Sequence, residues 1–163
     1  MEEVKLISVI ATALAASVVV AQTGAILASE KTMALSRMKH LSLATTMYTM
    51  DYDDCTPFVS STKDARIVLK LYVDEQDSFV SPRANSQFLY NVKIGGLYTT
   101  AIPSPADEIC WYEKTPVGID PVVAFLDARA KVIMPAESEK MKKTLTHTFK
   151  RDKSMKVIKV GSN

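Results

Sequence analysis

A long opening segment without proline limits what this chain can fold into. No charged residue occurs in residues 6–28, and the run continues without proline through an amphipathic, charged part at residues 29–52. At ~1.5 Å per residue the two parts predict a helical rod of roughly 70 Å, and the uncharged part alone is long enough to cross a bilayer. One small domain cannot bury such a rod. Lipid or copies of the same chain must therefore cover its apolar end.

Three interpretations of the uncharged segment are open. A cleavable signal peptide is suggested by the small residues 19–21 before Gln22, but the preceding residues 1–5 contain two acids and the apolar run is longer than such peptides have. A permanent membrane span fits the length. Packing against identical helices fits the many small side chains, which let backbones approach closely. These are Ala11, Ala13, Ala15, Ala16, Ser17, Ala21, Gly24 and Ala25.

The amphipathic part of the rod carries two apolar stripes at helical spacing. The first stripe contains Leu35, Met38, Leu41, Thr45, Tyr48 and Tyr52, and the second contains Leu43, Met47 and Met50. We expect the first stripe to pack on a sheet of the same chain and the second to be left for a neighbour. The methionines here are expected to fill space rather than to bind a metal or haem, and His40 is expected at the surface.

An acidic segment ends the rod before Pro57, which stops any helix. Asp51, Asp53 and Asp54 lie close enough in sequence to suggest a Ca²⁺ site. However, no loop with a glycine and a distant bidentate glutamate follows, as calcium loops of the EF-hand type require. We therefore expect a solvated turn.

Beyond the rod (residues 1–54, apolar at 1–28) the sequence predicts a globular head at residues 55–145. A short helix is expected at 62–73, capped by Thr62, with a buried face of Ile67, Val68, Leu71 and Tyr72. Strands are expected at 78–80, 88–90, 108–113, 121–126 and 130–134, with a turn at 127–129. Pro135 begins a helix that runs to about residue 145. This order predicts an α+β fold, with an antiparallel sheet leaning on the second half of the rod.

Charge and cysteine content leave two alternatives open. The net charge of +2 gives no reason to expect nucleic-acid binding. Residues 146–163 form a basic C-terminal extension, which either contacts an acidic partner or is a solvated terminus. Its structure is either a strand pair or a flexible tail. Cys55 and Cys110 are either free thiols or a disulfide, which would stabilise the head by ~4 kcal/mol.

The sequence contains no pattern typical of catalysis. The two histidines lie far apart in the chain, and there is no glycine-rich phosphate loop, nucleophile elbow or cysteine pair at metal spacing. Asp127 follows a predicted strand, where catalytic carboxylates occur, but an acidic hairpin turn explains it better. We expect neither an enzyme nor a bound cofactor or metal.

A resemblance to a known family adds to this picture. Residues 35–54 read LSRMKHLSLATTMYTMDYDD and are similar to the pattern LSNLKQLGLALMMYAQDYDE of bacterial pilin-like proteins, whose sequences often end in a His-x9-Asp-Gly motif. Weaker similarities follow in the same order at residues 72–82, 102–108 and 123–127. Val117 and Ala128 stand where that motif has its histidine and glycine. The chain thus resembles the type IV pilin and type II secretion pseudopilin superfamily.

The resemblance implies a pilin-like fold and a subunit of a helical filament, inserted in the bacterial inner membrane before assembly and located at the cell surface afterwards. A gapless alignment places Glu3 on the family's helix-start glutamate and 14–16, Leu14-Ala15-Ala16, on its LAA. A buried Glu3 needs a positive partner, which we expect to be the α-amine of Met1 in an adjacent subunit. Gly24 has poor helix propensity and is expected to stretch locally in a filament.

Two other functions are alternatives to a filament of identical subunits. One is a minor pseudopilin of a type II secretion-like machine, and the other is a monomeric membrane-anchored binding module. The sequence does not separate these three.

Overall fold

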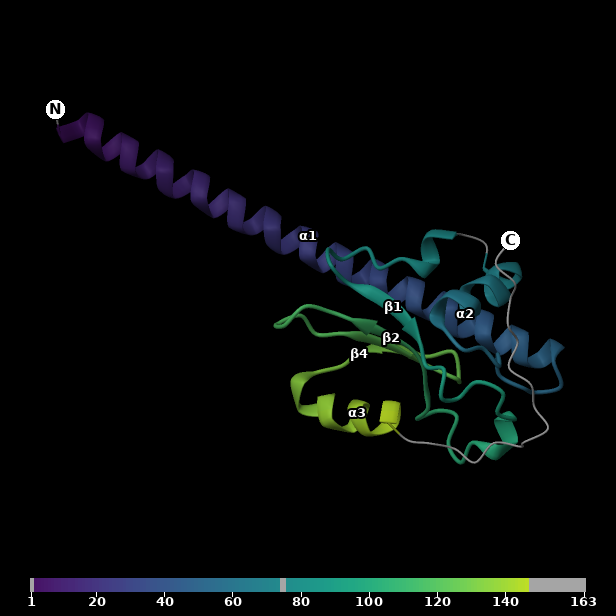
Figure 1. The fold of residues 1–163 in the computed structure, drawn as a ribbon. Helices are drawn as coiled ribbons and strands as arrows, with labels where there is room; N and C mark the ends of the chain where they lie inside the picture. The colour runs from purple at the N-terminus through teal and green to yellow at the C-terminus, as the bar shows by residue number, and fades with distance from the viewer. Residues whose placement is uncertain (1, 74–75, 147–163) are drawn as a thin grey trace.

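A single long helix organises the structure, a computed structural model that describes residues 2–73 and 76–146. Helix α1 spans Glu2–Asp51, a run of 50 residues, as the absence of proline predicted. Its C-terminal half lies against the head, and its N-terminal half projects away from the head (Figure 1). The rod expected from the sequence is confirmed. The basic extension from residue 147 onward lies outside the described residues.

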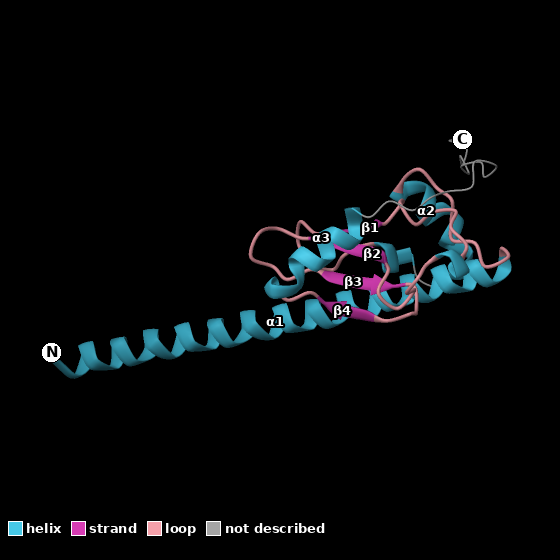
Figure 2. Cartoon of the chain, turned by 90° about the horizontal axis from the view of Figure 1, so that it is seen from below, coloured by secondary structure: helices cyan, strands magenta, loops and turns pink. Residues whose placement is uncertain are grey.

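The head contains one four-stranded antiparallel sheet in the order β1-β2-β3-β4. The strands are β1 (Gln87–Tyr90), β2 (Ile109–Lys114), β3 (Val122–Phe125) and β4 (Ala130–Val132). All four residues of β3 are buried, because α1 covers one face of the sheet and α3 (Ser138–Thr146) covers the other (Figure 2). The structure is therefore α+β, with the sheet as the middle of three layers.

The first apolar stripe of α1 packs on the head as expected except for Tyr52, which follows the last helical residue and is 51% exposed. Met38 and Leu41 are fully buried and Tyr48 nearly so. Between them the contact is polar: the Thr45 hydroxyl accepts a hydrogen bond from Nε1 of the buried Trp111 at 3.0 Å and donates to the Leu41 carbonyl. This pairing satisfies a buried indole N–H, which would otherwise lose its bond to water without replacement.

Two more hydroxyls join α1 to the end of β3. Ser42 donates to the carbonyl of Phe125, and Thr46 donates to the carbonyl of Leu126 at 3.3 Å. Small hydroxyl side chains let the helix approach the strand closely while bonding the backbone groups at its end. We call this row of contacts between α1 and the sheet the hydroxyl seam.

A buried ion pair joins the loop before β1 to the strands. The carboxylate of Glu113 on β2 is 1% exposed, lies 3.5 Å from Nη1 of Arg83 and accepts hydrogen bonds from the Ser81 hydroxyl and the Val122 N–H. Arg83 also donates to the carbonyl of Asp120 at 2.8 Å. Several partners compensate for removing this carboxylate from water. The alternating sequence pattern of β2 did not predict this ion pair.

The short helix differs in detail from its prediction. Helix α2 is Thr62–Leu69, and a 3-10 turn, η1 (Lys70–Tyr72), completes it. Its N-cap is Ser61, one residue earlier than expected, because the Ser61 hydroxyl accepts from the Asp64 N–H. The expected buried face was wrong in part. Val68 and Tyr72 are half-buried against the core, but Ile67 and Leu71 are 44% and 90% exposed. The fully buried residues of α2 are Ala65 and Leu69.

The other head elements agree with the sequence, with one exception. Strands at 88–90, 108–113, 121–126 and 130–134 are confirmed to within two residues, and the 3-10 turn η4 (Pro135–Glu137) precedes α3. The strand expected at 78–80 is wrong, because this segment belongs to the 3-10 turn η2 (Gln76–Phe79). Phe79 is buried there against Trp111, so an aromatic contact with the core rather than strand pairing fixes the segment.

The hydroxyl seam predicts a measurable stability effect at one position. Thr45→Val keeps the side-chain volume but leaves the Trp111 indole N–H without an acceptor, so we expect the free energy of unfolding to fall by about 1–3 kcal/mol. Urea denaturation followed by tryptophan fluorescence measures this free energy, and the signal reports on this site because Trp111 is the only tryptophan. The matched control is Thr32→Val on the exposed part of α1, with an expected change within about 0.5 kcal/mol. Equal effects of the two variants would contradict the role of the seam.

Candidate assembly surface

The head leaves part of α1 uncovered. We call residues 22–33 the arm; within it every side chain is exposed except Glu30, which is half-buried, and the next residue along the chain, Ala34, is fully buried. Ile26 and Leu27 are 57% and 62% exposed. The arm bears no charge before Glu30. It is therefore an apolar helix surface for which the described part of the chain supplies no cover.

Most residues expected to act in assembly lie further toward the N-terminus. Met1 lies outside the described residues, and the side chains of Glu3, Leu14, Ala15 and Ala16 are likewise outside the description, although their backbone belongs to α1. In the part of the chain described with side chains, no helix is long and apolar enough to cross a membrane.

Gly24 lies in the arm on an unbroken helix. A Cβ placed there would meet nothing within 4 Å, so no contact within the chain requires glycine. The stretching expected at Gly24 concerns the filament, and the single chain does not test it.

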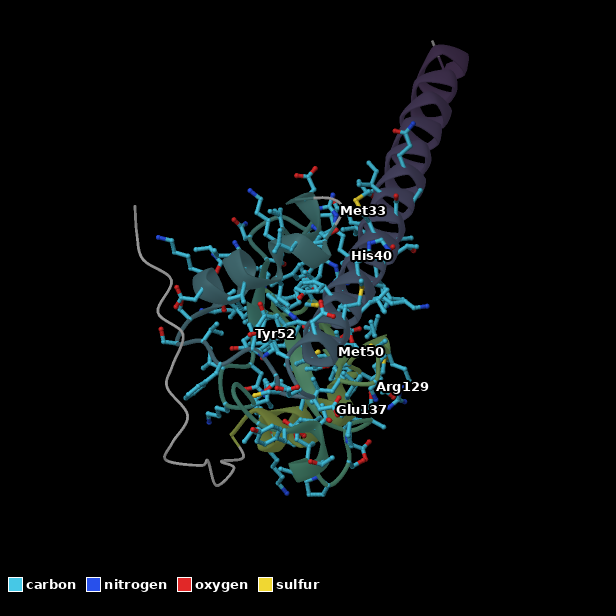
Figure 3. All side chains as sticks on the ribbon, turned by 90° about the vertical axis from the view of Figure 1, so that its right-hand side faces the viewer. Met33, His40, Met50, Tyr52, Arg129 and Glu137 are labelled. Atoms are coloured by element: carbon cyan, nitrogen blue, oxygen red, sulfur yellow. The ribbon has the colours of Figure 1, made fainter. Side chains whose placement is uncertain are left out.

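The second apolar stripe of α1 is uncovered, as the sequence predicted. Leu43, Met47 and Met50 are 48%, 44% and 74% exposed. His40 is exposed beside them, also as predicted, and Met33 lies further along the helix, at the end of the arm nearest the head (Figure 3). Scattered apolar side chains are ordinary on a protein surface, but a continuous apolar stripe indicates an interaction site.

The exposed stripe forms one wall of a groove. This α1–η1 groove has a volume of about 320 Å³. Its lining residues are His40, Leu43 and Met47 from α1, with Leu71, Tyr72, Val73 and Ser78 from the opposite wall. Apart from His40, none of these lining residues carries an ionisable group that is charged near neutral pH, and the exposed lining is a mixture of polar and apolar atoms.

Aromatic contacts hold the second wall of the α1–η1 groove in place. The Tyr72 hydroxyl donates to Asp51 at 2.8 Å, which raises the pKa of Tyr72 to about 12. The Tyr72 ring meets Tyr48 edge-on at 6.0 Å, and Tyr48 stacks on Tyr52 at 4.2 Å. The groove is thus formed before any partner binds.

Charge is distributed unevenly along the exposed side of α1. Lys31, Arg37 and Lys39 lie in or beside the arm together with the acidic Glu30, whereas only acidic residues gather at the opposite end of the helix. Asp53 and Asp54 have φ angles of 50° and 58° and form the expected exposed turn. Among the described residues, no group of acidic, histidine or cysteine side chains is arranged to hold a metal ion.

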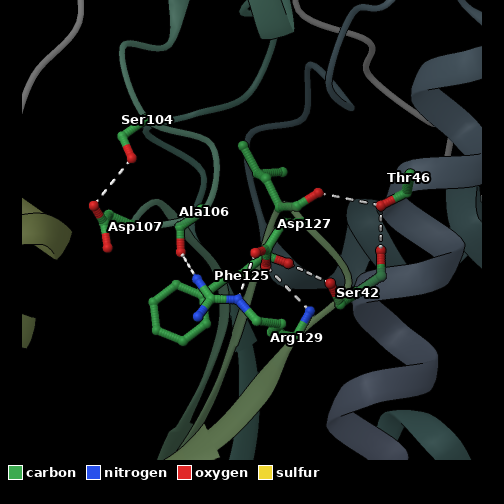
Figure 4. A network of polar contacts seen from close by, with 9 residues as sticks. Ser42, Thr46, Ser104, Ala106, Asp107, Phe125, Asp127 and Arg129 are labelled. Atoms are coloured by element: carbon green, nitrogen blue, oxygen red, sulfur yellow. Dashed lines mark hydrogen bonds and ion pairs between the residues drawn. The ribbon is translucent and has the colours of Figure 1, made fainter.

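A second groove, of about 500 Å³, lies between α1 and the β3–β4 hairpin, and its cations are largely paired already. Arg129 pairs with Asp127, donates to the carbonyl of Ala106 and lies over the Phe125 ring (Figure 4). Lys131 pairs with Glu137. The hairpin turn expected around Asp127 is confirmed, since its carboxylate accepts from the N–H of Arg129. This groove therefore has little free charge with which to bind an anion.

The two cysteines are free thiols in this structure, and no disulfide joins Cys55 to Cys110. Cys110 is fully buried in β2, where it donates to the Ala124 carbonyl, and burial raises the pKa of its thiol to about 12. Cys55 is partly exposed beside Tyr98, and burial raises its pKa as well. Both thiols are neutral at physiological pH and are poor nucleophiles in that form.

Comparison with family models, with curated proteins and with solved structures gives no match for this chain. The function must therefore be argued from the geometry of the chain.

Glu108, just before β2, has an unusual environment that the sequence did not indicate. The residue is 8% exposed, and its Oε1 atom has no hydrogen-bond partner among the residues that the structure describes. Burial raises the pKa of its carboxyl from 4.5 to about 7. The folded protein therefore holds this proton more tightly than the unfolded chain does.

The raised pKa of Glu108 predicts how the fold responds to pH. Because the folded pKa lies above the unfolded one, the contribution of this group is most favourable below pH 4.5 and is lost as the pH rises through about 7. Glu108→Gln replaces the carboxyl with a group that does not ionise, so the variant does not lose this stability as the pH rises. We therefore expect its free energy of unfolding to exceed that of the wild type by about 1–3 kcal/mol at pH 8, and by much less at pH 5. Denaturation at both pH values measures this, with Asp107→Asn as the exposed neighbouring control. A difference in unfolding free energy between Glu108→Gln and the wild type that is the same at both pH values would contradict the prediction.

Proposed function

We propose that this chain is the structural subunit of a pilus-like helical filament at the cell surface, which polymerises through α1. The observation that carries the proposal is the arm, a helix segment that is uncharged over residues 22–29 and leaves the head with these side chains exposed. Exposed apolar surface of this kind is unfavourable in water. Neighbouring copies would remove it from water, with the helices inside and the heads outside.

The asymmetry of the molecule favours an open polymer over a closed dimer. The arm lies in the middle of the rod, on the N-terminal side of the head, and the remaining exposed apolar stripe lies beside the head, toward the C-terminal end of the rod. A contact between two different surfaces of identical copies is heterologous, and it produces a filament when its rotation does not close. The bilayer would hold the uncharged segment before assembly, since 23 residues suffice to span it.

The similarity of residues 35–54 to pilin-like proteins supports the same proposal. These residues form the part of α1 that packs on the head, the expected place of that segment in a pilin-like fold. The partners are identical subunits and, before assembly, the inner membrane. The net charge of +2 gives no reason to add nucleic acid.

The proposal predicts that a charge in the arm blocks assembly. Leu27→Asp introduces a carboxylate where the filament would be apolar, so the filament yield should fall about ten-fold or more, given the several kcal/mol that burying an unpaired charge costs. The measurement is electron microscopy of filaments sheared from producing cells, with mass spectrometry of the subunit. Val117→Asp, on the fully exposed β2–β3 turn, is the matched control and should leave the yield unchanged.

The same preparation separates the alternatives. Filaments composed mainly of this chain support the proposal. Its presence only as a trace in filaments of another subunit would indicate a minor pseudopilin. A chain found only as a monomer in the membrane would overturn the filament and indicate an anchored binding module.

A further inference from the structure

We propose that the groove between α1 and the β3–β4 hairpin, which we call the hairpin groove, receives the arm of a second copy through the side of that arm that carries Ile26 and Met33. This inference rests on the proposed filament and deepens it. It names the surface of the head that a neighbouring arm contacts, and the side of the arm that makes the contact.

The hairpin groove continues the surface of the arm of its own copy. Its volume is about 500 Å³, and its exposed lining is mostly apolar. Residues of the β3–β4 hairpin form one wall, and Figure 4 shows Phe125 and Arg129 from it. The other wall consists of Thr32, Leu35, Ser36 and Lys39 of α1. Thr32 belongs to both the arm and the groove, so a helix that lies along this side of the arm runs directly into the groove.

The side of the arm that leads into the hairpin groove carries small side chains. Ala25 and Ala28 precede Thr32 at intervals of seven and four residues, so the three share one face of α1. All three side chains are exposed. Small residues let a second helix backbone approach closely. This side of the rod is therefore suited to a helix that brings larger side chains to the contact.

The arm carries large apolar side chains on a different side. Ile26 and Met33 are 57% and 45% exposed. They are seven residues apart, which places them on one face of the helix, two turns from each other. At ~100° per residue this face lies roughly 120° around the helix from Ala25 and Ala28. Each copy therefore presents a side with small residues to one neighbour and a side with large residues to another.

Leu27 does not take part in this contact, because it lies on the side of α1 that faces the head. It precedes Ala34 by seven residues, and Ala34 is fully buried in the core of the head. A neighbouring helix laid over Leu27 would meet that head within about two turns. The side with Ile26 and Met33 is turned roughly 100° away from the head, so it remains open to a neighbour.

The contact does not depend on attraction between charges. The residues on the docking side of the arm are uncharged; they are Gln22, Ile26, Ser29 and Met33. In the hairpin groove, Arg129 and Lys131 are each paired with a carboxylate of the same copy. Lys39 is exposed, and its long side chain allows the ammonium group to stay in water. An uncharged helix face therefore enters the groove without leaving a charge buried and unpaired.

A contact between unlike sides covers more apolar surface than one between like sides. Two copies joined groove to groove would leave Ile26 and Met33 in water on both. Two copies joined through these large residues would leave both grooves empty. Joining the large side of one copy to the groove of the next covers one of each at every contact, and the free groove at the end accepts another copy. The contact thus repeats along an open polymer.

Disulfide crosslinking of the full chain in producing cells tests the contact. The background is Cys55→Ser, which removes the partly exposed thiol, while the buried Cys110 stays. Ile26→Cys with Ser36→Cys places two thiols ~15 Å apart along one helix, too far for an internal bond. Gln22→Cys and Ser29→Cys, each with Ser36→Cys, sample about one turn on either side of Ile26. Mild oxidation of at least one of these three double variants should give a ladder of dimers, trimers and longer products.

Two control pairs test the side of the arm and the position of its seat. Lys31→Cys with Ser36→Cys uses an exposed position of the arm that faces away from Ile26, and it should give no ladder. Ile26→Cys with Ile67→Cys uses an exposed position on α2, outside the groove, and it should give none either. A ladder from a control pair and none from the three test pairs would overturn the proposed contact. Crosslinking of Ser36→Cys to a different protein, identified by mass spectrometry, would also overturn it.

Ser36→Trp adds a test that does not depend on cysteine. Ser36 is exposed in the single chain, so the head should fold normally, but the indole would fill the groove. Filament yield should fall about ten-fold, the effect of losing ~1.4 kcal/mol of contact free energy. Ile67→Trp, at an exposed position on α2, is the matched control and should leave the yield unchanged.

The outcomes distinguish the two proposals. Filaments of this chain that give none of the three predicted crosslinks, and that tolerate Ser36→Trp, leave the filament intact and overturn the hairpin groove as the seat of the arm. A chain that forms neither filaments nor crosslinked multimers overturns both.

Discussion

The hydroxyl seam between α1 and the sheet is the constraint on which the rest of the structure depends. The hydrogen bond from the Trp111 indole to Thr45, with the Ser42 and Thr46 contacts at the end of β3, fixes the position of α1 along its axis relative to the sheet. An all-apolar contact would tolerate a shift along the axis, whereas directional hydrogen bonds do not. Because the C-terminal half of α1 is held in this way, the N-terminal half must project. The arm is thus a consequence of how the head packs.

The head is small, and its limited hydrophobic core is supplemented by layers on both faces of the sheet and by buried polar pairs. The sheet is covered on both faces, so β3 is buried throughout despite its four residues. Glu113, Arg83 and Ser81 join the loop before β1 to the middle of the sheet, and the same side chains bond the backbone groups of Asp120 and Val122. Breaking such a buried pair by removing one member costs about 3–5 kcal/mol. The head is therefore held by a few specific contacts as well as by burial.

Long, strongly patterned elements could be predicted from the sequence, and short ones only in part. The rod and both of its stripes, apart from Tyr52, follow from a pattern over many residues, and four of the strands follow from apolar runs bounded by turn residues. The segment at 78–80 and the face of α2 do not, because in a short element one tertiary contact outweighs propensity. Phe79 packs on Trp111, and Ala65 with Leu69 turns α2 so that Leu71 faces outward. The α1 wall of the groove was therefore predictable, whereas the η1 wall depends on a rotation that only packing determines.

The composition of the exposed surface fits repeated contact with identical neighbours. A helical polymer that bends changes the spacing of its subunits slightly from one side to the other. Branched side chains packed closely at the contact would resist such shifts, because overpacking and cavities both cost free energy. Met47 and Met50 are unbranched and can change rotamers, so apolar contact persists while the backbones move. The same stripe that is left uncovered in the single chain thus has the side chains that a flexible, repeating interface needs.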